Sequence, residues 1–527
     1  MPTVHETTYQ LLRRHGLTTI FGNPGSNELP FLKNFPADFS YVLGLHEGVV
    51  LGMADGYAQA SGRTTFVNLH AAAGTGNAMG ALTNAMSSHT PLVITAGQQV
   101  RETLGVEPLL TNVAATMLPM PLVKWSYEPA CAGDVPRAMA QGIHMAALPP
   151  AGPVYLSIPY DDWDRPAPAT ADAVAARQVH GAIAPSTDVL RALAQRLNMA
   201  RNPVMILGAQ VDTPGAYDAA LKLAEKQRLP VWVAPSCPRC PFPTGHRLFR
   251  GLLPAGMATI SRMLQGHDLI LVVGAPVFRY HQYDPGLALP KGSELVAVMD
   301  DPLEASRPWM GDAILGDAQL SLEALRDFTD TTGRKWPDPL PHVAASAGGV
   351  SGRLAPEQVF DIVARTAPAD AVYVNESTST TAQLWQRLPM NQPRSYFFPA
   401  AGGLGFGLAA AVGVQLALPD RRVIAIVGDG SANYAISALW SAVQYQVPVI
   451  FLIMNNGSYG ALRWFAQALN VDEVPGLDVP GIDFCALAQG YGMRSSRVHD
   501  AESLSTQLDQ ALGLKIPFLI EVMTELG

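Results

Sequence analysis

Asp429 and Asn456 are the residues whose type and spacing point most clearly to chemistry. They stand in the motifs Gly428-Asp429-Gly430 and Asn455-Asn456, 27 residues apart. That interval has room for one helix and one strand, so both side chains should lie at the carboxyl ends of neighbouring parallel strands. A carboxylate, an amide oxygen and a nearby main-chain carbonyl form an all-oxygen set that suits Mg²⁺. A pair of ordinary tight turns is the alternative, and the combined spacing argues against it.

Hydroxyl and glycine residues beside these motifs are suited to binding phosphate. Gly430 and Ser431 follow the aspartate and should open a helix, whose free N–H groups and dipole attract anions. Thr378 and Ser379 belong to the Ser-Thr-Ser-Thr run at 377–380, which comes directly after another expected strand. Because Mg²⁺ usually completes its coordination shell with water and phosphate oxygens, we expect one shared site for the ion and a phosphorylated ligand.

The elements that must position these residues follow one pattern along the chain. Short apolar runs that end in polar turns predict a strand ending at residue 21 and further strands at 41–45, 65–69, 91–95, 153–158, 204–207, 230–234, 269–273, 295–298, 371–375, 396–398, 423–427 and 448–454. Helical patterns separate many of these strands, which is typical of parallel sheets covered on both faces. Stretches rich in alanine and proline at 164–187 and 329–355 are expected to be linkers.

The sequence therefore predicts an α/β protein with three doubly wound parallel-sheet domains, at residues 1–180, 181–340 and 341–527. The first and third look like the same α/β unit used twice. Ligands of such sheets bind beyond the carboxyl ends of the strands, which is where the polar turns lie.

Composition excludes some partners and favours others. The chain has 35 basic and 44 acidic residues, a net charge of −9, which argues against nucleic acid as the main partner. Only 15% of the residues are charged and 48% are apolar, so we expect large subunit interfaces. No apolar run approaches the roughly 18 residues of a membrane span, and the charged N-terminus is unlike a secretory signal. We expect a cytoplasmic protein with no membrane partner.

With these motifs in place, the chain resembles the thiamine diphosphate-dependent decarboxylase family, whose signature is GDG followed at about this distance by NN. The resemblance covers nearly the whole chain and implies a pyrimidine-binding, a middle and a diphosphate-binding domain, in that order. It implies thiamine diphosphate as cofactor, with Mg²⁺, or Ca²⁺ in its place, held by Asp429, Asn456 and the carbonyl of Ser458.

The resemblance also implies which residues contact the cofactor. Leu404, in the run AGGLGFG, should support its bent shape, and the carbonyl of Gly402 should receive its 4′-amino group. The remaining cofactor contacts are Thr378, Ser379, Gly430, Ser431 and Tyr459.

Glu47 is the second anchor of the resemblance. In this family a glutamate from the N-terminal domain of one subunit faces the aminopyrimidine N1′ of a cofactor held by another subunit. The cofactor then supplies the electron sink, and the protein supplies orientation and proton transfer. An acid at a helix start also has an ordinary explanation, because acids stabilise first turns, but the apolar flanks LGLH and GVVLGMA predict burial. The implied assembly is a dimer at least, and the family commonly forms homotetramers.

Ser26, His70 and His281 narrow the choice within the family. Each alone has an ordinary explanation, as a turn serine, a histidine bonded to backbone groups and a loop histidine. Together with the segments FGNPGSNELPFLK, NLHAAAGTGNAMGAL and VFRYHQYDPG they resemble the benzoylformate (phenylglyoxylate) decarboxylase branch. The resemblance implies a carbon–carbon lyase that converts benzoylformate to benzaldehyde and carbon dioxide in mandelate breakdown, with some carboligation.

The same resemblance assigns roles to these residues. Ser26 would hold the substrate carboxylate, and His70 would give a proton to the former keto oxygen and later help to release the aldehyde. His281 would protonate the carbon that carbon dioxide leaves. Histidine suits such transfers because its pKa lies near working pH. An apolar pocket for the phenyl ring would use Leu110, Phe398, Ala461, Leu462 and Phe465, although plain helix packing also explains the last three.

Three other functions stay open. The first is another 2-oxo acid decarboxylase or carboligase, acting on a branched-chain or a different aromatic 2-oxo acid. The chain has no His-His dipeptide, which disfavours pyruvate decarboxylases. The second is a non-catalytic cofactor-binding protein. The presence of Glu47 together with the metal motif argues against it. The third is an oxidase with flavin in the middle domain, where no G-x-G-x-x-G motif is present.

Overall fold

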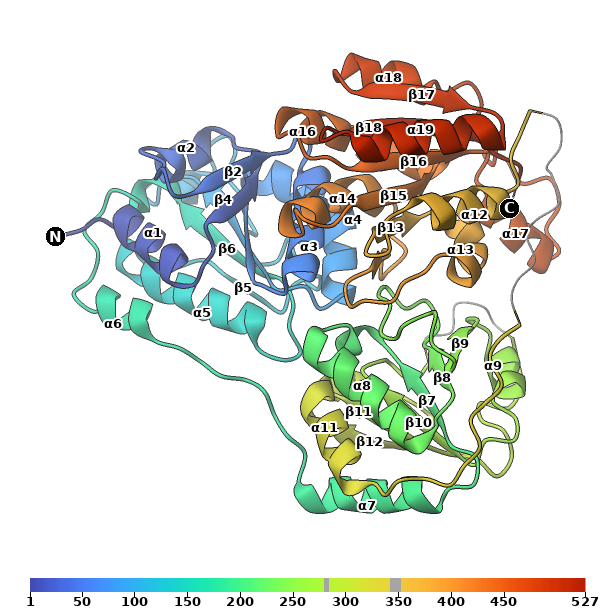
Figure 1. Ribbon diagram of the computed structural model, residues 1–527. Coiled ribbons are helices and arrows are strands. Elements are labelled where there is room, and N and C mark those ends of the chain that lie inside the picture. The colour runs from blue at the N-terminus through green and yellow to red at the C-terminus, as the bar shows by residue number, and fades with distance from the viewer. Residues whose placement is uncertain (279–283, 342–351, 527) are drawn as a thin grey trace.

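The computed structural model describes residues 1–278, 284–341 and 352–526. The described residues form three six-stranded sheets, one in each third of the chain (Figure 1). The strand pairs of all three sheets are parallel. The predicted α/β fold class with three doubly wound domains is confirmed. The boundaries at about 180 and 340 stay predictions.

The first sheet has the strand order β2-β1-β3-β4-β6-β5. Its strands are β1 (Thr19–Gly22), β2 (Ser40–Leu43), β3 (Thr65–Leu69), β4 (Leu92–Gln98), β5 (Trp125–Tyr127) and β6 (Val154–Pro159). Its helices are α1 (Val4–Arg14), α2 (Leu29–Leu32), α3 (Glu47–Ser61), α4 (Ala71–Ser87), α5 (Val135–Ala147) and α6 (Ala171–Ala176). All residues of β3, β4 and β6 are buried, as expected for strands with helices on both faces.

The third sheet, β14-β13-β15-β16-β18-β17, repeats the strand order of the first. Its strands are β13 (Val372–Glu376), β14 (Tyr396–Phe397), β15 (Val423–Gly428), β16 (Ile450–Asn455), β17 (Arg494–Val498) and β18 (Phe518–Met523). Its helices are α12 (Pro356–Thr366), α13 (Thr381–Arg387), α14 (Phe406–Ala417), α15 (Asp429–Ala432), α16 (Ala438–Gln444), α17 (Gly460–Ala468), α18 (Phe484–Gly490) and α19 (Ala501–Gly513). The predicted repetition of one α/β unit is confirmed, and α3 and α14 are its equivalent helices.

The middle sheet has a different order, β12-β11-β10-β7-β8-β9. Its strands are β7 (Val204–Leu207), β8 (Val231–Val233), β9 (Phe249–Leu252), β10 (Leu269–Val273), β11 (Glu294–Met299) and β12 (Asp312–Leu315). Its helices are α7 (Thr187–Met199), α8 (Pro214–Gln227), α9 (Met257–Met263), α10 (Pro302–Ser306) and α11 (Ala318–Phe328). This order is that of dinucleotide-binding folds, in which glycines in the turn after the first strand approach the cofactor. Gly208 stands in the corresponding turn after β7, but a Cβ there would lie 2.3 Å from Ala275 Cβ. This glycine therefore allows two turns of the protein to pack closely.

The two similar domains pack against each other through α3 and α14, with the middle domain on one side of them (Figure 1). Glycines allow the helices to approach closely. A Cβ on Gly56 would lie 2.3 Å from Ala410 O, and one on Gly413 would lie 1.9 Å from Met53 O. Residues of both domains therefore share one apolar core, and this core fixes how the two sets of strand ends lie relative to each other.

The structure adds elements that the sequence patterns did not predict. Strands β5, β9, β12 and β17 lie at sheet edges and carry partly exposed side chains, so they lack a clear apolar run. Strand β18 was also not predicted, although its buried run FLIEVM is a pattern typical of a strand. The expected linker at 164–187 contains the short helix α6. Among the described residues, no helix combines the length and apolar character that crossing a lipid bilayer requires.

Candidate active site

The Asp429 and Asn456 turns meet at the carboxyl ends of β15 and β16, as predicted. Asp429 is only 2% exposed. Its Oδ2 accepts a hydrogen bond from Gly457 N at 2.7 Å, and its Oδ1 accepts one from Gly430 N at 2.9 Å. Asn456 Oδ1 accepts from Ser458 N at 2.9 Å. Burial raises the pKa of Asp429, against these N–H groups, which lower it. The site is therefore a buried group of oxygen atoms on two adjacent loops.

The hydroxyl run after β13 reaches the same place. Strand β13 pairs with β15 so that Glu376 is opposite Val427, which aligns the two following turns. A Cβ on Gly460 would lie 3.2 Å from Ser379 Oγ and 3.4 Å from Asn456 Nδ2. The start of α17, the Ser379 loop and the Asn456 loop are thus in contact, with Thr378 exposed beside them.

Gly430 is the point where the GDG turn meets Tyr459. A Cβ on Gly430 would lie 2.5 Å from Tyr459 Cε1, so only glycine leaves room for the ring. Burial raises the pKa of Tyr459. The helix that opens here, α15, is only four residues long, and the Gly430 N–H is bonded to Asp429. Ser431 is buried at the same turn. The contacts of Gly430 and Ser431 with the diphosphate stay predictions.

These residues fit a magnesium ion with a diphosphate. The predicted ligands, Asp429, Asn456 and the Ser458 carbonyl, are all oxygen donors, which hard cations prefer. Gly457 adopts φ +72°, and a Cβ there would have no atom within 4 Å. Open space beside a buried carboxylate leaves room for an ion and its phosphate ligands.

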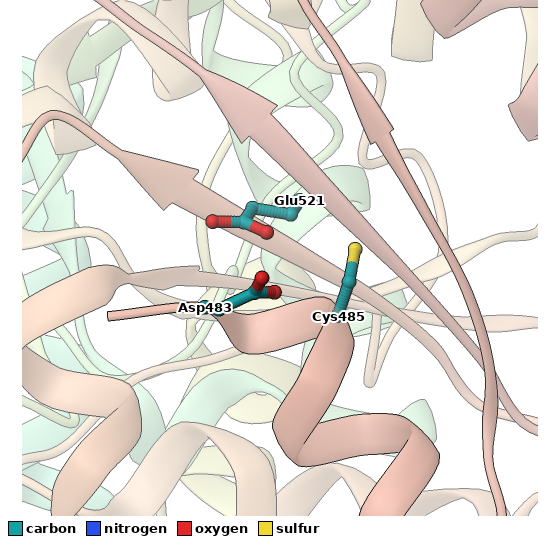
Figure 2. A group of neighbouring side chains, drawn as sticks. All are labelled: Asp483, Cys485 and Glu521. Atoms are coloured by element: carbon teal, nitrogen blue, oxygen red, sulfur yellow. The ribbon is translucent and has the colours of Figure 1, made fainter. Parts of the chain in front are cut away.

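A network behind this site supports the Asn456 loop. Asp483 and Cys485, at the start of α18, lie close to Glu521 of β18 (Figure 2). The Arg497 guanidinium pairs with Asp483 at 2.7 Å and with Glu521 at 2.9 Å, so a cation already balances the two acids. Glu521 also accepts a hydrogen bond from Asn455 Nδ2 at 2.7 Å. We therefore interpret this cluster as a support for the loop and not as a metal site.

Glu47 is the first residue of α3 and is buried, as its flanks predicted. Its Oε2 accepts a hydrogen bond from Asn77 Nδ2 at 2.9 Å, and its Oε1 accepts one from Asn23 Nδ2 at 3.3 Å. A Cβ on Gly74 would lie 3.0 Å from Glu47 Oε1, so α4 packs closely on the Glu47 carboxylate at this glycine. The two asparagines were not predicted from sequence, although Asn23 stands in the same GNPGSN turn as Ser26.

Glu28 is a further residue that was not predicted. It stands in the same turn as Ser26 and contacts His70. Its carboxylate is 1% exposed and lies 2.8 Å from His70 Nδ1. It also accepts hydrogen bonds from Gly25 N at 2.9 Å and Gly97 N at 2.7 Å. Ser26 is exposed at the start of the same short 3₁₀ turn, Ser26–Glu28. The structure thus brings the predicted serine and histidine to one end of the first sheet.

The other predicted site residues lie on several elements. Gly402, exposed at φ +73°, and the half-buried Leu404 belong to the loop between β14 and α14. The predicted ring pocket residues of the C-terminal domain are Phe398, after β14, and Ala461, Leu462 and Phe465 on α17. Leu110 belongs to the N-terminal domain and has φ +72°. His281 lies outside the described residues.

Models of known protein families match each of the three parts of the chain. Models of the N-terminal, central and C-terminal domains of thiamine pyrophosphate enzymes match residues 2–117, 190–325 and 376–522. The chain belongs to this family. The family predicted from the GDG and NN motifs is confirmed, and with it thiamine diphosphate (thiamine pyrophosphate) as the cofactor of the family.

Full-length relatives narrow the position of the chain among thiamine pyrophosphate enzymes. A benzoylformate decarboxylase of Pseudomonas aeruginosa is 63% identical over 100% of this chain and 99% of that protein. The structure of a 4-hydroxybenzoylformate decarboxylase of Rhodococcus jostii has a TM-score of 0.98 at 57% identity and covers 100% of both chains. A benzoylformate decarboxylase of Polynucleobacter necessarius has a TM-score of 0.97 at 40% identity, covering 100% of this chain and 99% of that one. The predicted resemblance to the benzoylformate decarboxylase branch is confirmed.

Proposed function

We propose that this protein is a thiamine diphosphate-dependent carboxy-lyase that converts benzoylformate to benzaldehyde and carbon dioxide. The observation that carries the proposal is the 63% identity over the full chain to the Pseudomonas aeruginosa benzoylformate decarboxylase. The buried Glu47, the Glu28–His70 pair and the oxygen-lined Asp429 turn support it, because each belongs to a different part of the required chemistry.

The cofactor would be held mainly by the C-terminal domain. Asp429, Asn456 and the Ser458 carbonyl would bind Mg²⁺, or Ca²⁺ in its place. The hydroxyls of Thr378, Ser379 and Ser431 would contact the diphosphate, and Gly430 and Tyr459 would shape the turn around it. Leu404 and the Gly402 carbonyl would contact the rings from the loop after β14. When bound, thiamine diphosphate supplies a nucleophilic carbon and an electron sink for the departing carboxylate.

Proton transfer would be the task of the N-terminal domain. Glu47 would exchange a proton with the cofactor at its carboxylate, which Asn23 and Asn77 hold in place. A carboxylate only accepts hydrogen bonds, so Glu28 requires the proton on His70 Nδ1 and leaves Nε2 for exchange with substrate. His70 Nε2 would then give a proton to the former keto oxygen, while Ser26 would bind the substrate carboxylate. His281 lies outside the described residues, and its role as the second proton donor stays a prediction.

The substrate ring would lie against apolar side chains near the start of α17. Ala461 and Phe465 are half-buried there, and Phe398 lies half-buried after β14. Leu462 and Leu110 complete the proposed pocket. Small apolar surfaces with polar groups at one end suit a phenyl ring that carries a charged 2-oxo acid group.

The active assembly would be a homodimer or a homotetramer made of two such dimers. Large apolar side chains are exposed on two segments of the single chain. Leu109 is 86% exposed and lies among Val106, Val113 and Met117; Leu469 is 69% exposed and follows Leu462 and Trp464. Exposed apolar residues in groups usually mark an interface. Light scattering should give at least twice the 56.1 kDa chain mass, and an active monomer would contradict this proposal.

The test of the function is the formation of benzaldehyde from benzoylformate. The protein, stripped of cofactor and metal, should be inactive and should recover activity only when thiamine diphosphate and Mg²⁺ are both added. Much faster turnover of pyruvate or a branched-chain 2-oxo acid would contradict the proposed substrate, but it would not affect the proposed cofactor.

A second candidate is decarboxylation of 4-hydroxybenzoylformate, which the likeness to the Rhodococcus jostii structure favours. The two candidates differ by one ring hydroxyl. A ratio of kcat/KM values for the two substrates decides between them, because a site built to bond that hydroxyl rejects the analogue that lacks it far more strongly than an apolar pocket does.

A further inference from the structure

Residues 399–405, in the loop between β14 and α14, are held by two buried side chains from different parts of the chain. They have the sequence PAAGGLG and include Gly402 and Leu404, the two residues predicted to contact the cofactor rings. A loop with three glycines has much conformational freedom, so its shape must be fixed from outside if it is to present those groups reproducibly.

Asn84 of α4 holds the middle of the loop. The side chain is 2% exposed, and its Oδ1 accepts hydrogen bonds from Ala401 N and Gly403 N, both at 3.2 Å. Its Nδ2 donates to Gly403 O at 2.8 Å. A Cβ on Gly403 would lie 3.1 Å from this Nδ2, so the loop approaches Asn84 as closely as glycine allows. The residues bonded to Asn84 flank Gly402 on both sides.

Glu376 at the end of β13 holds the other end of the loop. The side chain is fully buried, and its Oε1 accepts hydrogen bonds from Gly405 N at 2.8 Å and Phe406 N at 3.1 Å. Its Oε2 accepts from Gly407 N at 2.8 Å. The carboxyl group thus occupies the N-terminus of α14, where the helix dipole favours a negative charge. Burial works against that charge and raises the pKa of Glu376 to about 8.

The residues that Asn84 and Glu376 hold lie on both sides of Gly402 and Leu404. Residues 401 and 403 are bonded to Asn84, and residues 405 to 407 are bonded to Glu376. The Gly402 N–H donates to Pro399 O at 3.1 Å, and a Cβ on Gly402 would meet no atom within 4 Å. The Gly402 carbonyl and the Leu404 side chain, which are the groups predicted to face the cofactor, are therefore not used by the bonds to Asn84 and Glu376.

We propose that Asn84 and Glu376 act together as positioning residues, a clamp that holds residues 401–407 in the shape that binds the cofactor. The inference rests on the proposed function, since it concerns the same cofactor. Glu376 is followed directly by the Ser377–Thr380 run, so the clamp links the loop at the rings to the loop at the diphosphate. Asn84 belongs to the other domain, so the clamp also makes the cofactor loop depend on how the two domains pack.

The experiment measures binding of thiamine diphosphate to the full chain freed of cofactor, at fixed Mg²⁺ concentration. Asn84→Ala and Glu376→Gln should each raise the Kd roughly 10- to 100-fold, because each removes or weakens three hydrogen bonds. Asn84→Asp keeps both accepting contacts and should raise it less than Asn84→Ala. At saturating cofactor the KM for benzoylformate should stay near that of the parent, since neither residue contacts substrate.

Two variants serve as matched controls. Asn391→Ala removes an asparagine that also accepts a hydrogen bond from a glycine across a domain boundary, from Gly245 N at 2.9 Å. Asp317→Asn changes an acid that also holds a helix N-terminus, through Leu320 N at 2.9 Å. Both should bind the cofactor as the parent does. An equal loss of binding in the controls would overturn the clamp, since the effect would then be general.

Hydrogen exchange on the parent protein provides a test that needs no variant. In the cofactor-free protein the amides of residues 401, 403 and 405 to 407 should exchange slowly. Fast exchange there would overturn the clamp, as would a Kd in Asn84→Ala and Glu376→Gln equal to that of the parent. A parent that does not bind thiamine diphosphate at all would instead overturn the proposed function.

Discussion

Glu28 Oε2 and His70 Nδ1 lie 2.8 Å apart, and the carboxylate in this pair is buried. The same carboxylate accepts hydrogen bonds from the N–H groups of Gly25, Ala71 and Gly97. A Cβ on Gly25 would lie 2.1 Å from His70 Nδ1, so the turn after β1 packs directly on the imidazole. The position, the tautomer and the orientation of His70 are therefore determined by Glu28 and its turn.

Replacing Glu28 with Gln should lower kcat roughly 100-fold, because the amide no longer requires the proton on His70 Nδ1. The Kd for thiamine diphosphate should stay within a few-fold of that of the parent. Steady-state kinetics on Glu28→Gln, His70→Ala and the double variant check the mechanism. If Glu28 acts through His70, the double variant should be no slower than His70→Ala; a further additive loss would contradict that role.

Glu47→Gln should lower kcat by at least about 100-fold while the cofactor still binds, because the amide accepts a hydrogen bond but does not exchange a proton in the same way. Asn77→Ala should cause a smaller loss, since it removes one of the two amide groups that orient the Glu47 carboxylate. Benzaldehyde formation at saturating cofactor measures both. A Glu47→Gln variant as active as the parent would show that the proposed proton path is wrong.

Asp429→Asn should weaken Mg²⁺ binding about 100-fold or more, because a neutral amide replaces the one charged side chain among the proposed protein ligands. Activity should then require far more added Mg²⁺ after treatment with EDTA. Asp420→Asn, at an exposed acid in the turn before β15, is the control and should behave as the parent. Equal metal dependence in the two variants would argue against the ligand assignment.

Arg239 and Asp212 form a buried ion pair, 2.8 Å apart, where all three domains meet. Arg239 also lies over the Phe397 ring and bonds to Gln59 O. Arg239→Met should lower the stability by about 3–5 kcal/mol, because Asp212 is left buried without its partner. Arg13→Met, which breaks the exposed pair with Asp38, should lower the stability far less, because solvent screens that pair. Melting temperatures of both variants measure the difference.

The loss in Arg239→Met should depend on pH. Burial raises the pKa of Asp212 to about 6 even though Arg239 lowers it, so removing Arg239 should raise that pKa further. Between about pH 4 and 6 the folded states of parent and variant both keep this proton, and both lose stability as the unfolded chain ionises. Above pH 6 only the variant continues to lose stability. The difference in melting temperature should therefore be larger at pH 8 than at pH 5, and the opposite trend would contradict the assignment.

Much of the candidate site was accessible from sequence because its residues follow strands directly. Asp429 and Asn456 each end an apolar run, and parallel strands bring such ends to one edge of a sheet. The buried position of Glu47 followed from its apolar flanks in the same way. The edge strands β5, β9, β12 and β17 were not predicted, since half-exposed strands carry no continuous apolar run.

The side chains that hold the site residues in place were not predictable from sequence. Glu28 stands in the same turn as Ser26, and nothing in the sequence distinguishes it from other acids in turns. Only the tertiary structure shows that His70, which follows β3, lies 2.8 Å from it. Asn84 bonds to a residue 319 positions away, and no local pattern indicates such a partner. The buried Glu376 would have been taken for an ordinary polar residue at a strand end.

From its order of amino acids alone, this chain specifies three parallel α/β domains, an oxygen-lined turn whose ligand set suits a divalent ion, and a sequestered acid, because strand ends and apolar runs are local features. Only the tertiary structure decided which buried carboxyl and amide groups orient them. Those hydrogen bonds depend on how α3, α4 and α14 pack, and packing sets distances between residues that are hundreds of positions apart.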